Sequence, residues 1–514
     1  MSDDLVLRGD AADEQLIEIV ATPDYINPEP LGKVNLLVIG GGPAGLVAAA
    51  GAAGLGAKVA LAERRMMGGD CLNFGCVPSK AMLASARAVG VVARGESYGL
   101  RVDETGCDFE AVMARVRAVR ARLAPHDGLT RFLEMGIKVH LGSAQFTGPD
   151  EADVDGKPIR FHRALISTGA APLLPDIPGL DDAAPLTSES LYTLTELPRR
   201  LAIIGAGPMG CEVAQAFSRF GSEVVVIEAA DSPLGNADPD AAAVVRQALE
   251  EDGVTVMLGA RIDQVTREGD LTRIQLQHGE ASKTVACDTL LVAAGRRPVT
   301  GGLGLESAGV DFDPATGIET DDRLRTTNPR IYAAGDCTAK GGHTHVADAH
   351  ARIVIRNALF RGRERWSGGA VPACTYTDPE LAHVGLSHEA AGERGATTLT
   401  LPFDQVDRGV LDGADEGFAR VHLDAGGRIL GATCVGRGAG DLIALPALLM
   451  SQDMPLAALN ETILPYPTRA SAWKQLADQA NRARLTPGRA RLLRWWLKAL
   501  IGGDRRRPGT GIEV

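Results

Sequence analysis

Two copies of one glycine-rich unit limit what this chain can fold into more than any other feature. In the first copy the apolar run VNLLVIGGGPAG, residues 34–45, ends in Gly40, Gly42 and Gly45. A stretch rich in alanine and glycine follows, and a second apolar run ends at Glu63. Strand, glycine turn, helix and strand in this order are typical of a dinucleotide-binding βαβ unit, in which backbone N–H groups approach a pyrophosphate and the carboxylate accepts ribose hydroxyls. The pattern predicts a dinucleotide site, with a merely structural tight turn as the alternative.

The second copy is RLAIIGAGPMGCEVAQAFSRFGSEVVVIE, with Gly205, Gly207 and Gly210 in its turn and Glu228 at the end of its second strand. Two dinucleotide units in one chain predict a flavoprotein that is reduced by a nicotinamide, whereas one unit would suit a simple dehydrogenase. A carboxylate at Glu228 accepts hydrogen bonds from a free 2′-hydroxyl and repels a 2′-phosphate, and the next two residues are uncharged. NADH is therefore predicted over NADPH.

Three further apolar runs end in glycine turns and would connect the nucleotide domains. They are LISTGAAP at 165–172, LLVAAGRRP at 290–298 and RIYAAGDC at 330–337. The last run ends with Asp336, a carboxylate placed to bind a chain of sugar-like hydroxyls.

The composition fits a soluble α/β protein of several domains, with 514 residues, 45% of them hydrophobic, and a net charge of −12. The acidic balance argues against nucleic acid as a main partner. Residues 1–30 show no secretory leader, and no apolar stretch approaches the length that spans a bilayer. The eight cysteines are too scattered for a secreted disulfide framework, so a cytoplasmic location is predicted.

Only Cys71 and Cys76, in GGDCLNFGCVPSK, lie close together in the sequence. In a regular helix positions i and i+5 have Cα atoms about 8–9 Å apart, whereas a disulfide tolerates only about 4.4–6.8 Å. The pair is therefore expected on a distorted helical turn, which Gly75 makes easier. A helix N-terminus and Lys80 would both favour the thiolate.

These motifs together resemble the class I pyridine nucleotide–disulfide oxidoreductases, which include glutathione reductase, dihydrolipoamide dehydrogenase and mercuric reductase. GGGPAG, GGDCLNFGCVPSK, STGA, GAGPMGCE, AAGRRP and YAAGDC run in the family's order over residues 34 to about 475. The cysteine segment is most similar to the mercuric-reductase-like and dihydrolipoamide dehydrogenase-like branch.

The resemblance implies a role for each matching residue. Cys76 would face the flavin, Cys71 would be the interchange thiol, and Lys80 would lie by the flavin and pair with Glu212. The residues implied to contact FAD are Gly40, Gly42, Gly45, Glu63, Lys80, Ala144, Thr168, Asp336 and His345. Those implied to contact NAD are Gly205, Gly207, Gly210, Glu228 and Gly295.

The same resemblance implies an α/β fold with two Rossmann-like dinucleotide-binding domains and a C-terminal α+β dimerisation domain. The predicted parts are an N-terminal extension (1–33), a discontinuous FAD-binding domain (34–170 and 297–365), an NAD(H)-binding domain (171–296), a dimerisation domain (366–480) and a basic amphipathic tail (481–514).

The chain departs from the family in the dimerisation domain, which would complete the partner's active site in a homodimer. The family has a His-Pro-Thr segment there, followed by a glutamate, and the pair deprotonates the interchange thiol. This chain has Tyr466, Pro467 and Thr468, and Ser471 in place of the glutamate. Both halves of the expected base are missing, so Tyr466 is predicted to act as a hydrogen-bond donor. Mercuric reductases also have a tyrosine near this place, but the resemblance implies for them a vicinal cysteine pair close to the C-terminus and a CxxC metal-capture module. Here no cysteine follows Cys434 and no CxxC precedes residue 34, so mercuric ion reduction is not predicted.

Two other groups of residues are given structural roles. His343, His345 and His350 lie close together, but no carboxylate or cysteine completes a ligand set, so no metal site is predicted. Cys211, Cys337 and Cys374 are expected to be buried packing residues.

The tail sequence TPGRARLLRWWLKALIGG, residues 486–503, predicts a helix with Thr486 as its N-cap, Pro at its first position and Gly at its end. One side would gather Leu492, Leu493, Trp496, Leu497, Ala499 and Leu500. The other side would gather Arg491, Arg494 and Lys498, and Arg505, Arg506 and Arg507 follow. Such a helix suits the surface of an anionic membrane, through residues 486–507, or packs on the protein's own body. It is too short and too charged to span a membrane.

The sequence thus predicts an enzyme that passes electrons from NADH through FAD to a Cys71–Cys76 disulfide and on to an acceptor, most simply another disulfide. One alternative is an NADH dehydrogenase at the inner face of the membrane that reduces a quinone or a metal ion. Another is a redox sensor that uses the flavin and disulfide as a switch. No residue identifies the acceptor.

Overall fold

The computed structural model describes residues 10–29, 32–101, 106–485 and 487–502. It separates into two units, with the boundary between Glu380 and Leu381. The five-part division predicted from the sequence is finer than this boundary and stays a prediction.

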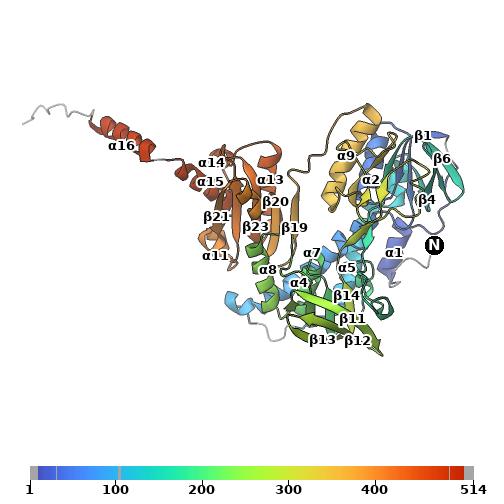
Figure 1. The fold of residues 1–514 in the computed structure, drawn as a ribbon, viewed down its shortest axis with the longest axis horizontal. Helices are drawn as coiled ribbons and strands as arrows, with labels where there is room; N and C mark the ends of the chain where they lie inside the picture. The colour runs from blue at the N-terminus through green and yellow to red at the C-terminus, as the bar shows by residue number, and fades with distance from the viewer. Residues whose placement is uncertain (1–9, 30–31, 102–105, 486, 503–514) are drawn as a thin grey trace, which may run out of the picture. The chain divides into compact units, whose positions relative to one another are not determined.

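The first unit is built on a seven-stranded sheet (Figure 1). Four parallel strands run in the order β3–β2–β1–β6, β18 extends the sheet beside β6, and β5 and β4 join as antiparallel strands. The strands are β1 (Lys33–Ile39), β2 (Val59–Glu63), β3 (Lys138–Leu141), β4 (Ala144–Gly148), β5 (Glu151–Val154), β6 (Lys157–Ile166) and β18 (Ile331–Ala333). β1 has consecutive apolar residues, and Leu36 to Val38 are fully buried, as expected for a parallel strand covered on both faces.

Helices cover this sheet on the side of the first glycine turn. α2 (Pro43–Gly54) and α9 (Thr344–Phe360) lie side by side against it (Figure 1). α2 starts with Pro43 at its first turn and is made almost wholly of Ala, Gly, Leu and Val, so it can approach the sheet closely. The remaining helices of this region are α1 (Ala11–Val20), α3 (Gly69–Asn73), α4 (Cys76–Ala93), α5 (Phe109–Leu123) and α6 (Leu129–Glu134).

A second parallel sheet repeats the arrangement within the same unit. Its order is β10–β9–β8–β14, and α7 follows β8 as α2 follows β1. The elements are β8 (Arg200–Ile204), α7 (Pro208–Phe220), β9 (Glu223–Ile227), α8 (Pro239–Glu251), β10 (Thr255–Met257) and β14 (Thr289–Val292). The predicted duplication of a βαβ unit is confirmed.

Smaller strands complete the first unit. An antiparallel sheet of β11 (Ala260–Glu268), β12 (Leu271–His278) and β13 (Ala281–Cys287) precedes β14. β7 (Ala170–Pro172) pairs with β15 (Arg296–Pro298), so the two predicted connections between the nucleotide domains run antiparallel to each other. β16 (Phe312–Asp313) pairs with β17 (Gly317–Ile318), and β19 (Pro372–Thr375) comes last.

The second unit has a sheet in the order β20–β23–β22–β21, in which β22 is antiparallel to both β21 and β23. Its strands are β20 (Glu380–Gly385), β21 (Thr397–Pro402), β22 (Phe418–Leu423) and β23 (Ile429–Gly436), and its helices are α10 (His388–Glu393), α11 (Asp407–Leu411), α12 (Ala439–Leu442), α13 (Ala444–Ser451), α14 (Ala458–Glu461), α15 (Ser471–Ala483) and α16 (Pro487–Gly502). α15 packs on the sheet through Trp473, which is fully buried and donates its indole N–H to Leu442 O (3.0 Å). The two Rossmann-like domains and the α+β domain predicted from the sequence are confirmed.

One stretch within the described residues, Gly69–Ala93, is long and apolar enough to cross a membrane by length and composition. It consists of α3 and α4, is interrupted between them, and packs against α5 and α7. Of its 18-residue apolar window, 39% is buried inside the protein.

Candidate functional site

The glycine turn after β1 is possible only because its residues lack side chains. Gly40 has φ +107°, and a Cβ on Gly40 would lie 2.3 Å from Ser167 O. A Cβ on Gly45 would lie 1.8 Å from Gly40 O, so this glycine sets how closely α2 approaches the turn. Gly42 is the N-cap of α2 and lines a cavity, and a Cβ there would lie 3.8 Å from Gly69 Cα.

The acidic residue of each copy is bonded to its own glycine turn. Glu63 accepts hydrogen bonds from Gly41 N (2.6 Å) and Arg65 N (2.7 Å). Burial raises the pKa of Glu63, and these two backbone N–H groups oppose that effect. Glu228 accepts in the same way from Ala206 N (2.7 Å) and Ala230 N (2.9 Å). A carboxylate has about four acceptor positions, so each can still accept from a ribose.

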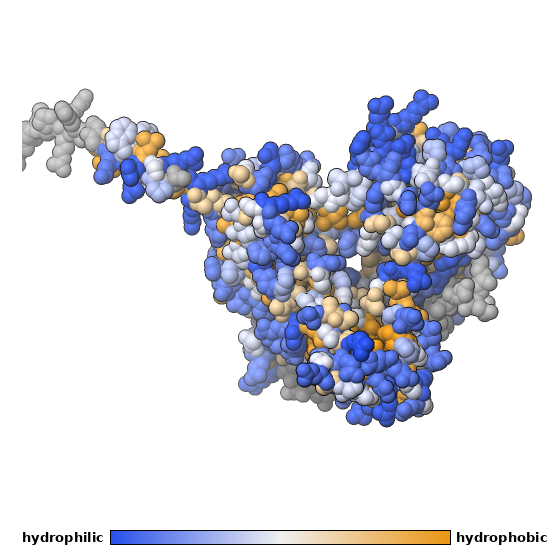
Figure 2. Space-filling view, in the orientation of Figure 1, coloured by the Kyte–Doolittle hydropathy of each residue, from blue (hydrophilic) through white to orange (hydrophobic). Residues whose placement is uncertain are grey.

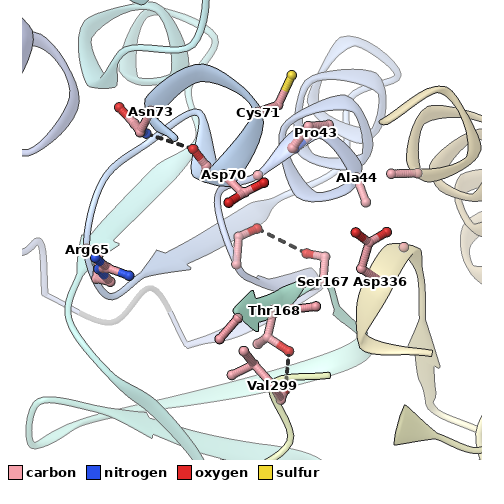
Figure 3. Close-up of a pocket in the computed structure, with 18 of the residues that line it drawn as sticks. Pro43, Ala44, Arg65, Asp70, Cys71, Asn73, Ser167, Thr168, Val299 and Asp336 are labelled. Atoms are coloured by element: carbon pink, nitrogen blue, oxygen red, sulfur yellow. Dashed lines mark hydrogen bonds between the residues drawn. The ribbon is translucent and has the colours of Figure 1, made fainter. Parts of the chain in front are cut away.

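A cavity lies at the start of α2, between the ends of β1 and β6 and the helix α3 (Figure 3). The residues predicted to contact FAD that line it are Gly40, Gly42, Glu63, Thr168 and Asp336. Asp336 accepts from Gly342 N (2.8 Å) at one side of the cavity, and Thr168 donates to Val299 O (2.7 Å). A glycine turn without side chains, a helix N-terminus and carboxylates at two strand ends fit the phosphates and hydroxyls of FAD.

Four residues given the same role lie elsewhere. Gly45 packs α2 on the turn, and Lys80 lies in α4 beside the second glycine helix. Ala144 is a buried residue of β4 in the sheet core. His345 does not line the cavity and contacts Pro372 O (2.8 Å), whereas its neighbour Thr344 does line it.

The cysteine segment adopts the interrupted helix that the Cα spacing required. Cys71 lies in α3 and Cys76 is the first residue of α4, while Gly75 between them has φ −113° and ψ −111°. A Cβ on Gly75 would lie 2.8 Å from the Asp70 carboxylate. Cys71 is half-buried and lines the cavity, and Cys76 is exposed.

The two thiols have opposite acidities. The hydrogen bond from the Cys71 thiol, with help from Thr344 and Lys80, lowers the pKa of Cys76 to about 6, although the surrounding protein partly desolvates this sulfur and opposes the effect. The same hydrogen bond raises the pKa of Cys71 far above its ordinary value, and burial adds to the increase. At neutral pH the pair therefore holds one thiolate, on Cys76, and one proton, on Cys71.

Lys80 is fixed by contacts with the second glycine helix. Its ammonium donates to both Glu212 oxygens (3.1 and 2.8 Å), which confirms the expected pairing. Glu212 is buried and also accepts from Tyr376 N (2.8 Å), and the Lys80 ammonium lies 4.5 Å from the centre of the Tyr376 ring. Sequence reasoning missed Tyr376, because nothing in VPACTYTDPE marks it as the neighbour of a lysine almost three hundred residues earlier.

Thr344 lies beside the Cys76 thiol, and two histidines flank it in the sequence. Thr344 Oγ1 lies 3.3 Å from Cys76 Sγ, and the rings of His343 and His345 stack 5.1 Å apart. Within the part of the chain that the structure describes, no three His, Cys, Asp or Glu residues gather closely enough to hold a metal ion. Cys374, expected to be buried, is a half-buried residue of β19, whereas Cys211 and Cys337 are buried as predicted.

The second glycine turn repeats the packing of the first. Gly205 has φ +106°, and a Cβ on Gly210 would lie 2.0 Å from Gly205 O. Gly207 caps α7, and nothing lies within 4 Å of the position its Cβ would take. Gly295 has φ +126° and its carbonyl accepts from Leu173 N (3.0 Å), where the two domain connections meet.

Tyr466 has a carboxylate partner that the sequence did not reveal. Its hydroxyl donates to Asp407 Oδ2 (2.6 Å), and this bond raises the pKa of Tyr466 above its ordinary value. Ser471, in the place of the family's glutamate, donates instead to Thr468 O (2.7 Å). Asp407 precedes Tyr466 by almost sixty residues in the sequence, so spacing alone could not identify it.

Known families and proteins match nearly the whole chain. A model of the pyridine nucleotide-disulphide oxidoreductases matches residues 34–351, and a model of their dimerisation domain matches residues 371–477. A mercuric reductase of Bacillus cereus is 32% identical over 469 residues, which are 91% of this chain and 74% of that protein. A dihydrolipoyl dehydrogenase of Chlamydia muridarum is 35% identical over 457 residues, 86% of this chain and 96% of that protein.

Solved structures agree with these matches. The HOCl-induced flavoprotein disulfide reductase RclA from Escherichia coli superposes with a TM-score of 0.77 at 29% identity, covering 86% of this chain and 99% of that one. A Cu(II) complex of the same protein superposes with a TM-score of 0.78. Since both family models match and the thiol pair lies beside a duplicated dinucleotide fold, the chain belongs to the pyridine nucleotide-disulphide oxidoreductases and is an FAD-dependent oxidoreductase that uses a pyridine nucleotide.

Proposed function

We propose that this protein is an NADH-dependent, FAD-containing reductase in which Cys71 and Cys76 form the redox-active disulfide and an external disulfide is the first candidate acceptor. The observation that carries the proposal is the placement of the two thiols, Cys71 in the wall of the cavity and Cys76 at the start of α4, the helix that carries the Lys80–Glu212 ion pair. The lowered pKa of Cys76 and the raised pKa of Cys71 agree with it. Bound FAD would supply the transfer of two electrons from the nicotinamide to the disulfide.

The residues of this chain account for the other steps. Glu212 and the Tyr376 ring hold the Lys80 ammonium, which stabilises the Cys76 thiolate. An external disulfide RSSR is reduced when Cys71 sulfur, after losing its proton, bonds to one RS sulfur and expels the other as RS⁻. Cys76 sulfur then bonds to Cys71 sulfur and expels the second RS⁻, so two electrons leave the pair and its disulfide re-forms. The two RS⁻ take up two protons.

Steady-state turnover with NADH and NADPH tests the coenzyme assignment. We expect kcat/KM to be at least about tenfold higher with NADH, because Glu228 repels a 2′-phosphate at the end of β9. Glu228→Ala should reduce this NADH-to-NADPH ratio, mainly by weakening the binding of NADH. A wild-type preference for NADPH would contradict the assignment, whereas no reduction by either coenzyme would contradict the proposed function itself.

The Tyr466–Asp407 pair determines which acceptors suit the enzyme. The family's histidine would be substantially neutral at pH 7 and could take the proton of the interchange thiol, but a tyrosine whose pKa is raised cannot. Tyr466 is 76% exposed, but its hydroxyl already donates its proton to Asp407. Turnover with glutathione disulfide or lipoamide should therefore be poor and lack a limb near pH 6.5. Acceptors that need no base, tested in the same assays, should be reduced faster.

A metal ion is the second candidate acceptor. One observation favours it: RclA has been solved as a Cu(II) complex. In this chain Thr344, which lies beside Cys76, is flanked by the stacked imidazoles of His343 and His345. The same assays, run with Cu(II), quinones and disulfides, separate the candidates by which one accelerates NADH oxidation.

The dimerisation domain supports a homodimer. The second unit exposes apolar side chains near Tyr466, including Ile463, which is 94% exposed, and Val410 and Leu411 in α11. A partner copy would cover such a surface.

The helix α16 is proposed to bind an anionic membrane surface. Its apolar side chains are exposed, including Trp495, Trp496 and Leu500. Figure 2 shows hydrophobic and hydrophilic surface together on this helix. It carries four basic and no acidic residues in a chain whose net charge is −12. The predicted helix is confirmed over residues 487–502, whereas Thr486 and Arg505, Arg506 and Arg507 lie outside the described residues. An exposed apolar face with an opposite basic face matches the headgroup region of anionic lipids.

Removal of the tail after Leu485 tests this membrane contact. The full chain should co-sediment with vesicles that contain phosphatidylglycerol and should be released by salt, which screens the basic side chains. The truncated chain should stay in solution with an unchanged FAD content, since α15 is complete at Ala483. Equal sedimentation of the two chains, or equal binding to neutral phosphatidylcholine vesicles, would contradict the proposal.

A further inference from the structure

The N-terminal segment, which the family models leave unmatched, is part of the core behind the thiol pair. The matches begin at residue 34, yet α1 buries Leu16 and Val20 completely. These side chains share one cluster with residues of the cysteine segment, namely Met66, Met67, Leu72 and Phe74. Val20 O also accepts a hydrogen bond from Met67 N (2.8 Å), just before α3. The segment thus contacts the chain that carries Cys71.

Two parallel ion pairs join α1 to α5, but only one of them reaches the cysteine segment. Asp10 pairs with Arg117, and Asp13 pairs with Arg120. Asp13 is 1% exposed and Arg120 is 2% exposed, so this pair is buried in the core. Arg120 uses a second nitrogen to donate to Asn73 O (3.0 Å), whereas Arg117 bonds to no residue of α3 among the contacts described.

Asn73 in turn holds the turn that precedes the cysteines. It is the last residue of α3, between Cys71 and Cys76, and it is fully buried. Its side-chain amide donates to Met67 O (3.1 Å) and to Gly69 O (2.8 Å). The contacts run without a break from Asp13 through Arg120 and Asn73 to both ends of α3. Since α3 is only one turn long, it has few hydrogen bonds of its own to fix its orientation.

We propose that Asp13 and Arg120 are positioning residues for the redox pair, and that the N-terminal segment holds α3 where the Cys71 thiol donates to the Cys76 sulfur. A misplaced α3 would weaken that hydrogen bond, and Cys76 would then lose much of its thiolate character. The proposal rests on the proposed function only in taking Cys71 and Cys76 as the redox-active pair. Its tests measure thiol chemistry and do not require turnover.

Matched substitutions of the two ion pairs distinguish positioning from general stability. Asp13→Asn and Arg120→Lys weaken the pair that reaches Asn73, because asparagine carries no charge and lysine has one nitrogen in place of the two guanidinium nitrogens that bond separately to Asp13 and to Asn73 O. Asp10→Asn and Arg117→Lys make the same changes in the other pair. None of the four alters the groups that face Cys76, which are Cys71, Thr344, Lys80 and Asp70.

The measurement is the rate at which iodoacetamide alkylates the reduced, FAD-loaded protein near pH 6.5, resolved by peptide for Cys71 and Cys76. In Asp13→Asn and Arg120→Lys, iodoacetamide should alkylate Cys76 about tenfold more slowly than in the wild type, because only the thiolate reacts. The matched variants should stay within about twofold of the wild type. Equal effects from both pairs, or no effect from either, would overturn the proposal.

Amide hydrogen exchange in the unaltered protein is a second test, which holds even if the Asp13 and Arg120 variants fail to fold. Phe74 N and Gly75 N both bond to Asp70 O, at 2.8 and 2.6 Å, and report on the integrity of the loop between α3 and α4. They should exchange in the same opening event as the amides of α1. Loop amides that open well before α1 would show that the N-terminal segment does not hold the loop, and would overturn the proposal.

Discussion

We expect Cys76→Ser to abolish the long-wavelength absorbance that a thiolate beside an oxidised flavin gives, together with all turnover that uses the disulfide. The reason is that Cys76 is the sulfur whose pKa is lowered, to about 6, by the Cys71 thiol, Thr344 and Lys80. Serine has no thiolate to offer and cannot form a disulfide. Absorbance spectra of the protein after titration with two electrons, and NADH-dependent turnover, measure the two losses.

The Cys71→Ser variant is the matched control, and it should behave differently. It should retain the absorbance, because Cys76 remains, and still lose disulfide turnover, because the interchange sulfur is gone. A serine hydroxyl can replace the Cys71 thiol as a donor to Cys76. Undiminished absorbance in Cys76→Ser would show that the two roles are assigned to the wrong sulfurs.

The absorbance should also depend on pH in a direction fixed by the lowered pKa. An ordinary thiol would be protonated below about pH 8.5, but Cys76 should remain a thiolate down to about pH 6 and lose the absorbance below it. Lys80→Met removes one charge that stabilises the thiolate, so the midpoint should move to higher pH. A midpoint near that of a free thiol in the wild type would contradict the lowered pKa.

The duplicated fold could be predicted from the sequence because its causes are local. Glycine at fixed positions, an apolar run before it and a carboxylate at the next strand end are all set by the backbone geometry of one βαβ unit. The interrupted helix at Gly75 was predictable for the same reason, since two Cα atoms five residues apart in a helix are too distant for a disulfide.

What the sequence could not predict depends on contacts between distant segments. Asp407 beside Tyr466, Tyr376 beside Lys80, and Asp13 behind the cysteine segment are each polar residues without a local pattern. Cys374 was expected to be a buried packing residue, since cysteine is usually buried, but it is only half-buried in β19. Such pairings follow from the packing of whole elements, which spacing in one sequence does not record.

A glycine-to-alanine substitution in each glycine turn should show which turn serves NADH and which serves FAD. Gly210→Ala should slow reduction by NADH about a hundredfold while FAD content stays normal. Its Cβ would lie 2.0 Å from Gly205 O, and ordinary contact begins near 3.4 Å, so α7 must move outward by more than an ångström. A displacement of about 1 Å can cost about 10² in rate. Stopped-flow reduction by NADH and the flavin absorbance of the purified protein measure the two quantities.

The same substitution in the first turn should have the opposite result. A Cβ on Gly45 would lie 1.8 Å from Gly40 O, beside the cavity assigned to FAD, so Gly45→Ala should lose flavin on purification. Gly207→Ala guards against a simple folding defect in the second turn, because no atom lies within 4 Å of its Cβ and only an approaching pyrophosphate would meet the methyl group. It should fold with normal thermal stability and normal FAD content, yet bind NADH weakly. If Gly210→Ala and Gly207→Ala were reduced by NADH as fast as the wild type, the second glycine turn would not be the nicotinamide site.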